Sequence, residues 1–441
     1  MNFTSPAFIA FIFLSLAVYF IIPKSQRRLA LLVMSLLWYA SWNELWVVVL
    51  LSILSINYLL LSRSLITAIV FDVILLIFTR GASSIDIHFI NPFGSGLFGL
   101  LLLGVLIDHF RSPNRLRAIS FVEFSSFCLF FPLLVSGPIE RYSELGKQME
   151  SLPDLSRQNL EEGSLIFFFG LFKKLIVADA LSGAVSQVRT IHNQGLCNLI
   201  LAGLLSTYWI YVDLSSYCDM GRGVARCFGL RLTTNFKPFY YASDPTDFWR
   251  RWNITLGTWI RDYVTLPLLL RYGRKVSRYL ILLFAFVLLG LWHGFYVNWL
   301  IFGLFNGLLV VTSLWLRDRM SSSMPTTVSI VGFFLVFCLF FGNGILQSVT
   351  FGQLAEVGRI LALKNGLGDF IQFKEILMAA LPFLTLGFVI DALQERAGKP
   401  DFYLDYGGWQ RGFLGLTFAC VGLGKMLYDG PSGIPPLYFR F

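Results

Sequence analysis

A long stretch without charged residues, near the middle of the chain, limits the possible folds more than any other feature. Between Arg278 and Arg317 lie 38 residues that include no Asp, Glu, Lys or Arg. This length suits two membrane crossings, since one transmembrane helix takes about 20 apolar residues. His293 lies within the stretch. An ionisable side chain at membrane depth is costly, so His293 is predicted to serve a functional site, with a structural hydrogen-bonding role as the alternative.

Composition extends this interpretation to the whole chain. Of its 441 residues, 56% are hydrophobic and only 14% are charged, whereas soluble domains average about 25% charged residues. Residues 2–23 carry no charge, are too long for a signal-peptide core and precede no Ala-x-Ala cleavage site. They are expected to remain as a first transmembrane helix. Further apolar stretches centre near residues 35, 53, 72, 103, 130, 168, 204, 287, 306, 335, 383 and 418.

These stretches predict an all-α polytopic membrane protein with about ten to twelve membrane-embedded helices. The sequence has no internal repeat of fixed period and no low-complexity linker. It therefore does not predict separate soluble domains. We therefore expect a single membrane domain over residues 1–441. Its expected parts are N-terminal helices (1–119), a catalytic core region (120–320) and C-terminal helices (321–441).

The cysteines and the net charge argue against two other kinds of protein. The six cysteines are scattered, without a Cys-x-x-Cys pair or a His/Cys cluster at metal-ligand spacing, so neither a disulfide framework nor a metal site is predicted. The net charge of +9 is typical of cytoplasmic loops that face anionic lipid headgroups. Membrane lipids are therefore expected partners, and nucleic acid is not.

One charged segment of the central region has the features of a helix. Asp244 suits the N-cap and Pro245 the first helical position, while Pro267 is expected to end the helix near Leu266. Such a helix is too charged for a simple span and suits an interface or a cavity wall. A surface-lying amphipathic helix without any chemistry is the alternative.

The faces of this expected helix separate apolar from charged residues. At about 100° per residue, one face is shared by Asn253, Leu256, Gly257 and Ile260. A stripe of charged residues lies beside this face. Within it, Arg250 has nearly the same azimuth as Arg261, and Arg251 has nearly the same azimuth as Asp262.

Several motifs in series resemble the membrane-bound O-acyltransferase family. They are 247–256 (DFWRRWNITL), 259–263 (WIRDY) and 291–294 (LWHG), preceded by 130–142 (FFPLLVSGPIERY), 170–174 (GLFKK) and 213–223 (DLSSYCDMGRG). The closest similarity is to the bacterial branch, the proteins of alginate O-acetylation and of D-alanyl transfer to teichoic acids. The motifs follow one another in order and at compatible spacing, and the resemblance covers at least residues 95–310.

The resemblance implies a ring-like bundle of transmembrane and re-entrant helices around a central tunnel that holds His293. It implies transfer of an acetyl or other short acyl group to a hydroxyl of a cell-envelope polysaccharide or glycan, with a lipid acceptor as the alternative. No bound cofactor is expected, and the donor would be acetyl-CoA or an acyl carrier protein thioester. The expected location is the cell inner (cytoplasmic) membrane, with an extracytoplasmic acyltransferase or esterase-like protein as a further partner.

Asn253 departs from the pattern of the bacterial branch. We expect His at this position there, whereas lysophospholipid and peptide acyltransferases of the wider family often place Asn. Asn253 and His293, 40 residues apart, therefore fit the wider family's catalytic pair. This departure affects the prediction of the acceptor class more than the prediction of the reaction type.

The two residue types suit direct acyl transfer. A neutral imidazole is the ordinary general base near neutral pH, so His293 is predicted to take the acceptor hydroxyl's proton and return it to the leaving thiolate. Asn253 is predicted to donate its amide N–H to the developing oxyanion. The chain has no Gly-x-Ser-x-Gly motif and no cysteine with a sequence-adjacent base, which favours transfer without an acyl-enzyme.

Other polar and aromatic residues receive weaker predictions. Those expected to bind substrate are Trp252, Trp292, Arg250, Arg251, Arg261 and Asp262. Interfacial belts are the alternative for the tryptophans. Glu140 and Arg141 are expected to pair with neighbouring residues at a membrane interface, with substrate contact as the alternative. A buried hydrogen-bonding role explains Asp213 and Asp219 as well as catalysis does. The remaining histidines, His88, His109 and His192, are expected in surface loops.

The aromatic end of the chain contains Tyr438. Similar Tyr-Phe endings occur in the bacterial branch or its partner proteins, which makes the Tyr438 hydroxyl a candidate acyl relay. Interfacial anchoring by its ring is the alternative.

Two functions of other classes stay open at this point. A transporter or flippase for a lipid-linked saccharide would also have many helices and few buried polar groups. It would show repeats and broken helices in matching halves, and we find neither in the sequence. A structural scaffold would leave His293 unexplained.

Overall fold

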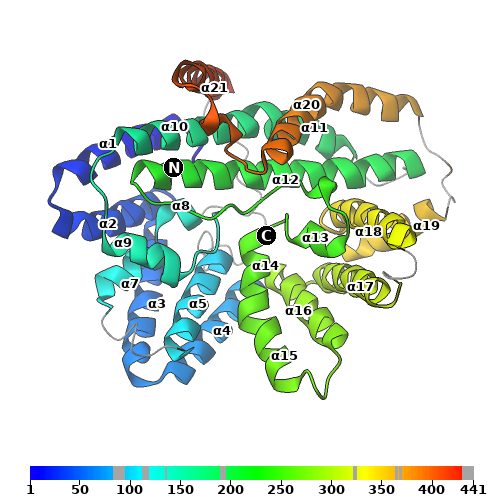
Figure 1. The fold of residues 1–441 in the computed structure, drawn as a ribbon, viewed down its shortest axis with the longest axis horizontal. Helices are drawn as coiled ribbons and strands as arrows, with labels where there is room; N and C mark the ends of the chain where they lie inside the picture. The colour runs from blue at the N-terminus through cyan, green and yellow to red at the C-terminus, as the bar shows by residue number, and fades with distance from the viewer. Residues whose placement is uncertain are drawn as a thin grey trace. The chain divides into compact units, whose positions relative to one another are not determined.

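Helices form all the regular structure of the described residues. The computed structural model describes residues 1–82, 95–111, 119–134, 137–188, 195–320, 325–362, 366 and 370–429. Within these ranges every regular element is a helix and no strand occurs (Figure 1). The predicted all-α class is therefore confirmed.

The described residues group into two compact units. The first takes its residues from Met1–Phe172, Ser216–Thr234 and Tyr403–Phe441, and the second is formed by Lys173–Ser215 and Asn235–Phe402. Both units combine segments that are distant in the sequence. The expected division at residues 119 and 320 stays a prediction.

The first unit holds most of the N-terminal helices. These are α1 (Pro6–Ile21), α2 (Arg27–Ala40), α3 (Glu44–Arg63), α4 (Leu65–Ala82), α5 (Ser95–Arg111), α7 (Phe121–Cys128), α8 (Phe131–Leu134), α9 (Lys147–Glu150), α10 (Arg157–Phe172) and the late helix α21 (Gly408–Asp429). Short helical turns in this unit are η1 (Lys24–Gln26) and η3 (Tyr142–Gly146). The long helix α12 (Leu196–Cys227) contributes its residues up to Ser215 to the second unit.

The second unit holds the other helices. They are α11 (Asp179–Val188), α13 (Pro245–Trp249), α14 (Ile254–Ile260), α15 (Leu266–Tyr272), α16 (Arg278–His293), α17 (Val297–Met320), α18 (Pro325–Leu346), α19 (Leu354–Leu361) and α20 (Phe370–Ala397). Shorter elements are η4 (Lys173–Ala178), η5 (Phe239–Tyr241), η6 (Arg261–Thr265) and η7 (Phe351–Gln353), and η8 (Phe402–Asp405) follows at the border of the units.

Five of the described helices are long and apolar enough to cross a membrane. Their spans are Glu44–Leu61, Leu196–Cys227, Val297–Met320, Thr326–Leu346 and Phe370–Ala397. Shorter apolar helices include α1, which covers Pro6–Ile21 of the expected first span, and α16. The expected count of ten to twelve is therefore not confirmed. The apolar pattern located helices well, since every predicted centre except residue 130 lies inside one.

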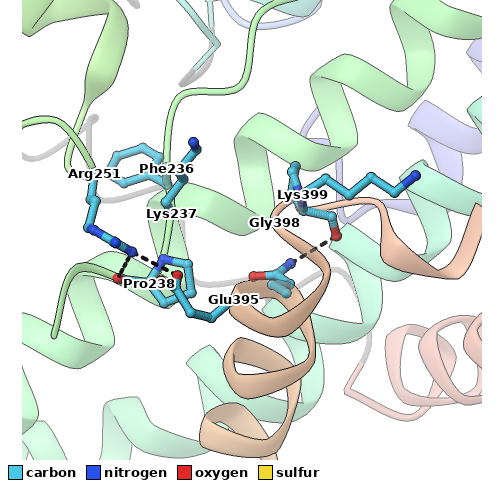
Figure 2. Close-up of a pocket in the computed structure, with 9 residues that line it drawn as sticks. Phe236, Lys237, Pro238, Arg251, Glu395, Gly398 and Lys399 are labelled. Atoms are coloured by element: carbon cyan, nitrogen blue, oxygen red, sulfur yellow. Dashed lines mark hydrogen bonds and ion pairs between the residues drawn. The ribbon is translucent and has the colours of Figure 1, made fainter. Parts of the chain in front are cut away.

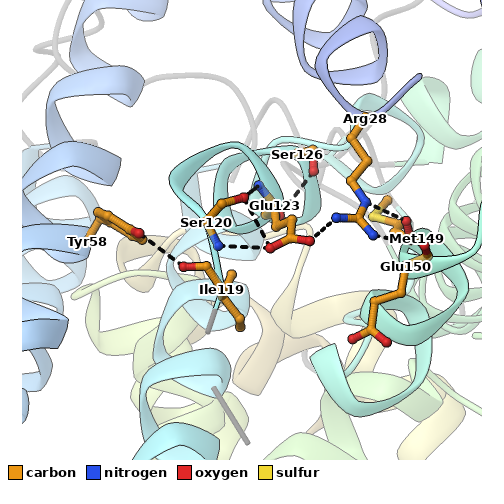
Figure 3. A network of polar contacts seen from close by, with 8 residues as sticks. All are labelled: Arg28, Tyr58, Ile119, Ser120, Glu123, Ser126, Met149 and Glu150. Atoms are coloured by element: carbon orange, nitrogen blue, oxygen red, sulfur yellow. Dashed lines mark hydrogen bonds and ion pairs between the residues drawn. The ribbon is translucent and has the colours of Figure 1, made fainter. Parts of the chain in front are cut away.

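A polar clamp in the first unit shows how charged residues serve its packing. Arg28 forms an ion pair with Glu123 and donates hydrogen bonds to the backbone oxygens of Met149 (2.8 Å) and Glu150 (2.9 Å) (Figure 3). Glu123 also completes a capping box with Ser120 at the start of α7. One guanidinium therefore joins α2, α7 and α9.

The helix expected over residues 245–266 is broken in the structure. Asp244 caps its start as predicted, accepting hydrogen bonds from Thr246 N (2.6 Å) and Asp247 N (3.0 Å). The first piece, α13, ends at Trp249, and a second piece, α14, begins at Ile254. The prediction of one continuous helix, with a single set of azimuths, was therefore wrong.

Backbone pairing with another segment explains the break. Lys237 N donates to Arg251 O (2.8 Å), and Ile254 N donates to Asn235 O (2.9 Å). These bonds use backbone groups near Arg251 that a continuous helix would need for its own ladder. Asn253, between the two pieces, adopts the left-handed conformation with φ 43° and ψ 55°.

The expected stop at Pro267 was also wrong. The chain stays helical to Tyr272, after passing through the wider π-helical turn η6. Proline lacks a backbone N–H, and its ring crowds the preceding helical turn. A π-helical segment directly before Pro267 changes the hydrogen-bond spacing at that point, so the helical path continues.

Candidate active site

Asn253 is held by a second asparagine. It is 5% exposed, and its Oδ1 accepts a hydrogen bond from Asn235 Nδ2 at 3.1 Å. Asn235 is itself fixed, because its Oδ1 accepts from both Thr255 N (2.9 Å) and Thr255 Oγ1 (2.8 Å). These contacts join the extended segment before η5 to the start of α14.

The contacts of Asn235 determine how the amide of Asn253 points. With two donors at its Oδ1, Asn235 must turn its Nδ2 towards Asn253. Asn253 therefore presents its oxygen to Asn235 and directs its own Nδ2 hydrogens to the other side. An amide N–H held in this way is the type of group that can donate to a carbonyl oxygen as negative charge develops there.

His293 is the last residue of α16 and lies among aromatic rings. Its imidazole stacks on Trp299 with 4.6 Å between ring centroids and 16° between planes. Trp292 and Phe302 meet it edge to face at 4.8 Å and 5.7 Å. The side chain is half-buried, so the ring has a restricted orientation and still reaches the surface of the protein.

A cavity of about 350 Å³ lies between α13, α14, η6, α16 and α17. Its walls are mainly apolar, and Arg250 and Arg261 both line it. The two arginines expected on one azimuth of a continuous helix thus do face one space, although the helix is broken. Ile254, which follows Asn253, and Leu289, one turn before His293, also line the cavity.

A helical hairpin connects the two predicted catalytic residues, neither of which is among the residues that line this cavity. The chain passes through α14, η6 and α15, turns at residues 273–277 and returns through α16, which packs against η6 and α15 (Figure 1). Asn253 precedes the first arm and His293 ends the second, so both lie at the end of the hairpin away from the turn. Their catalytic pairing stays a prediction.

The other predicted substrate residues have different surroundings. Trp252 is buried and stacks on Phe248 (5.8 Å, 14°), and Trp292 is buried beside His293. Arg261 Nε donates to the neighbouring Asp262 at 2.7 Å, on a more exposed part of η6. Tyr438 lies outside the described residues, so its role as a relay stays a prediction.

Arg251 binds groups of the protein itself. Its Nη1 donates to Glu395 Oε2 (2.7 Å) and to Pro238 O (3.2 Å), and its Nε donates to Asp247 Oδ2 (3.2 Å). Figure 2 shows the first two contacts at the edge of a small pocket that Lys237 also lines. The arginine therefore ties α20 to the segment before η5, and its predicted binding of substrate stays a prediction.

The sequence interpretation gave no role to a buried carboxylate in α20. Asp391 is 3% exposed and accepts hydrogen bonds from Tyr208 (3.1 Å), Tyr211 (2.9 Å) and Tyr240 (3.1 Å). A single Asp in an apolar helix was an available signal, since an intramembrane charge indicates function by default. The tyrosines that bind it are distant in the sequence, so only the fold brings them together.

Ion pairs and hydrogen bonds hold the remaining acidic candidates. Lys174 Nζ lies 2.6 Å from both Asp179 Oδ1 and Asp213 Oδ1. Asp219 accepts from Arg222 at 3.1 Å. For these aspartates the structural alternative is supported.

Glu140 is buried in the first unit. Its Oε1 accepts from Thr233 N (2.5 Å) and its Oε2 from Thr233 Oγ1 (3.1 Å). Burial raises the pKa of Glu140 to about 7, although the bonds from Thr233 act in the opposite direction. This carboxyl group will therefore titrate near neutral pH.

One expectation about the other histidines was wrong. His109 lies in α5 and is buried, because that helix continues past it to Arg111. His88 and His192 lie outside the described residues.

Comparison with known proteins agrees with the resemblance seen in the motifs. The profile of the membrane-bound O-acyltransferase family matches residues 34–351. The chain is 28% identical to a probable alginate O-acetylase, AlgI, of Pseudomonas syringae pv. tomato, across 91% of this chain and 83% of that protein. It is 27% identical to a peptidoglycan O-acetyltransferase of Helicobacter pylori, across 69% of each.

A teichoic acid D-alanyltransferase of Bacillus subtilis is 31% identical over a shorter region, 42% of this chain and 49% of that protein. The family profile, in contrast, spans well over half of the chain and includes the hairpin, Asn253 and His293. This protein therefore belongs to the membrane-bound O-acyltransferase family, and it is a multi-pass membrane O-acyltransferase.

Proposed function

We propose that this enzyme O-acetylates a cell-envelope polysaccharide, with His293 as general base and Asn253 as oxyanion donor. The hairpin supports this proposal, because Ile254, which follows Asn253, and Leu289, one turn before His293, line the same cavity. The relatives named as acetylases of alginate and peptidoglycan support acetyl as the acyl group and an envelope polymer as the acceptor.

The reaction follows from the chemistry of the two side chains. His293 takes the proton of the acceptor hydroxyl while the hydroxyl oxygen attacks the thioester carbonyl carbon. Negative charge develops on the carbonyl oxygen and is stabilised by the Asn253 Nδ2–H group. The carbon–sulfur bond then breaks, the ester forms, and the imidazolium returns its proton to the leaving thiolate.

The cavity is proposed to hold the acyl donor, acetyl-CoA or an acyl carrier protein thioester. Both donors carry phosphate next to a thiol-bearing arm, and guanidinium groups bind phosphate with paired hydrogen bonds. Arg250 and Arg261 line the cavity and supply such groups, while its apolar wall suits the uncharged arm. The guanidinium of Arg250 has no hydrogen-bond or ion-pair partner among the described residues.

The envelope acceptor requires a location in the inner membrane, where a cytoplasmic donor and an extracytoplasmic polymer are both within reach. We propose that an extracytoplasmic acyltransferase or esterase-like protein assists the final transfer. In that arrangement the Tyr438 hydroxyl would be the first acceptor in this reaction, and a second transfer would move the acyl group from Tyr438 to the polymer.

Mass spectrometry of the cell envelope tests the proposal. Polysaccharides and lipids are compared between cells with the protein, without it, and with His293→Ala. We expect acetyl esters on one polysaccharide to disappear in the second and third strains and to return with the wild-type protein. Loss of acyl groups from lipids alone would establish the lipid acceptor instead, and unchanged acylation of both would refute the proposal.

A further inference from the structure

A buried carboxylate in α20 is bound by three tyrosine hydroxyls from two other elements. Asp391 Oδ1 accepts from Tyr211 Oη at 2.9 Å, and its Oδ2 accepts from Tyr208 and Tyr240, each at 3.1 Å. The helix that carries Asp391 is apolar and long enough to cross a membrane. A carboxylate there is costly unless bound by several donors, so its presence calls for a role beyond packing.

Tyr211 connects Asp391 to the candidate active site through contacts of its ring. Its ring contacts Phe236 (6.2 Å between centroids) and Trp252 (6.4 Å). Phe236 directly follows Asn235, and Trp252 directly precedes Asn253. The rings of Phe236 and Trp252 also meet edge to face at 5.7 Å. Tyr211 therefore packs against the sequence neighbours of both Asn235 and Asn253.

A second contact from the same face of α20 holds this segment. Glu395 lies four residues after Asp391, which places both on one face of the helix. It accepts a hydrogen bond from Arg251 at 2.7 Å (Figure 2). Arg251 also donates to Pro238 O at 3.2 Å. Residues of α20 thus hold both of the backbone segments that carry Asn235 and Asn253.

We propose that Asp391 is a positioning residue for acyl transfer, which acts through Tyr211 on the direction of the Asn253 amide. Asp391 binds the Tyr211 hydroxyl, Tyr211 packs against Phe236 and Trp252, and these two residues set the backbone from which Asn235 and Asn253 extend. This inference rests on the proposed function, because it assumes that Asn253 assists the reaction.

The effect should appear in turnover more than in binding. A misplacement of about 1 Å at a reacting group can reduce a rate about 100-fold. The donor cavity is lined by other residues, from α13, α14, η6, α16 and α17. A change at Tyr211 or Asp391 should therefore lower kcat and leave the KM for the donor almost unchanged.

The tyrosine cluster provides its own matched control. Tyr208 makes the same kind of hydrogen bond to Asp391 as Tyr211 does. Its ring neighbours, however, are Tyr211, Tyr240 and Phe388, and they include neither Phe236 nor Trp252. Tyr208→Phe and Tyr211→Phe each remove one buried hydroxyl. Only the ring at position 211 packs against Phe236 and Trp252.

The experiment measures kcat, KM for acetyl-CoA and thermal unfolding of the purified full-length wild type and both variants. We expect Tyr211→Phe to lower kcat about 10- to 100-fold at unchanged KM. For Tyr208→Phe we expect kcat within about twofold of wild type, with a similar loss of unfolding temperature in both variants. Equal kcat in the two variants, whether reduced or not, would overturn the inference.

Asp391→Asn adds a test that does not depend on one tyrosine. Its remaining Oδ1 can still accept the Tyr211 hydroxyl, so it should retain more kcat than Asp391→Ala. Combined with Tyr211→Phe, Asp391→Ala should add little further loss of kcat, since each change removes the hydrogen bond between Asp391 and Tyr211. Fully additive losses would contradict the inference. A wild-type protein without turnover would refute the proposed function instead, so the two failures are distinguishable.

Discussion

Asn235 donates its side-chain amide to Oδ1 of Asn253 over 3.1 Å, and this bond determines which end of the Asn253 amide faces the rest of the site. Asn253 is also the only described non-glycine residue with a positive φ, 43°. Asparagine and histidine are both enriched in this left-handed region, which alanine avoids. The left-handed backbone at this position is therefore compatible with both residue types that the resemblance suggests there.

Asn253→Asp should abolish most turnover while the protein stays folded. Aspartate keeps an oxygen for Asn235 and tolerates the left-handed backbone, but it lacks the N–H donor. Loss of one oxyanion donor lowers kcat about 100- to 1,000-fold in other enzymes. Steady-state kinetics of the purified variant measure this.

Asn253→His is the informative companion, and we expect it to retain part of the turnover because histidine both donates and accepts. Asn253→Gly controls for backbone conformation, since glycine adopts a positive φ without strain. If Asn253→Asp has wild-type kcat, Asn253 does not act as the donor.

His293→Ala should remove turnover and leave folding intact. The imidazole is half-buried at the end of α16, so its loss leaves no closed cavity in the core, while removal of a general base costs about 100- to 10,000-fold in kcat. Turnover and thermal unfolding are measured together. Trp299→Phe is the control, because it alters the ring that stacks on His293 and keeps the base. A stable His293→Ala protein with most of its turnover would show that the assignment is wrong.

Gly257→Leu should block the cavity, whereas Gly257→Ala should be tolerated. A Cβ at Gly257 would meet only Trp249 O, at 3.6 Å, an ordinary contact distance. The larger side chain would extend into the space of about 350 Å³ that Gly257 lines. We expect a raised KM for the thioester donor in Gly257→Leu and near wild-type values in Gly257→Ala. Unchanged donor KM in the leucine variant would place the donor elsewhere.

The stability of the protein should fall as the pH rises through about 7, because of Glu140. Burial raises the pKa of its carboxyl from 4.5 to about 7 in the folded protein. A raised folded-state pKa gives stability that is fully present below the unfolded value and lost as pH rises through the folded value. The loss is about 1.4 kcal/mol for each pH unit between the two values.

Thermal unfolding of wild type and Glu140→Gln between pH 4 and pH 8 measures this effect. Glutamine can still accept from Thr233 N but does not titrate in this range. Its unfolding temperature should therefore depend less on pH than that of wild type. Identical pH profiles would mean that Glu140 is not the group responsible.

Tyr438→Phe should separate an acyl relay from a membrane anchor. The ring and its interfacial preference survive in this variant, while the hydroxyl is lost. The relay requires that acylation of the envelope acceptor collapse with the protein still inserted and abundant, as mass spectrometry and immunoblotting would show. Undiminished acylation would leave only the anchor.

The sequence by itself determined the helical class, the family and most of the helix positions. Apolar length and the absence of charge are local properties, so a stretch such as the one around His293 predicts helices without knowledge of its neighbours. The cap at Asp244 was likewise predictable, since the bonds that an N-cap makes are to residues two and three positions later.

The tertiary structure alone decided how the candidate site is built. The break at Asn253 depends on backbone bonds to Asn235 and Lys237, and the tyrosine cluster depends on α12 and η5 meeting Asp391 in α20. Each of these contacts joins residues that a local pattern does not connect. A helical period predicts which residues share a face, but it contains no information about the distant segment that competes for the backbone hydrogen bonds or supplies the donors for a buried charge.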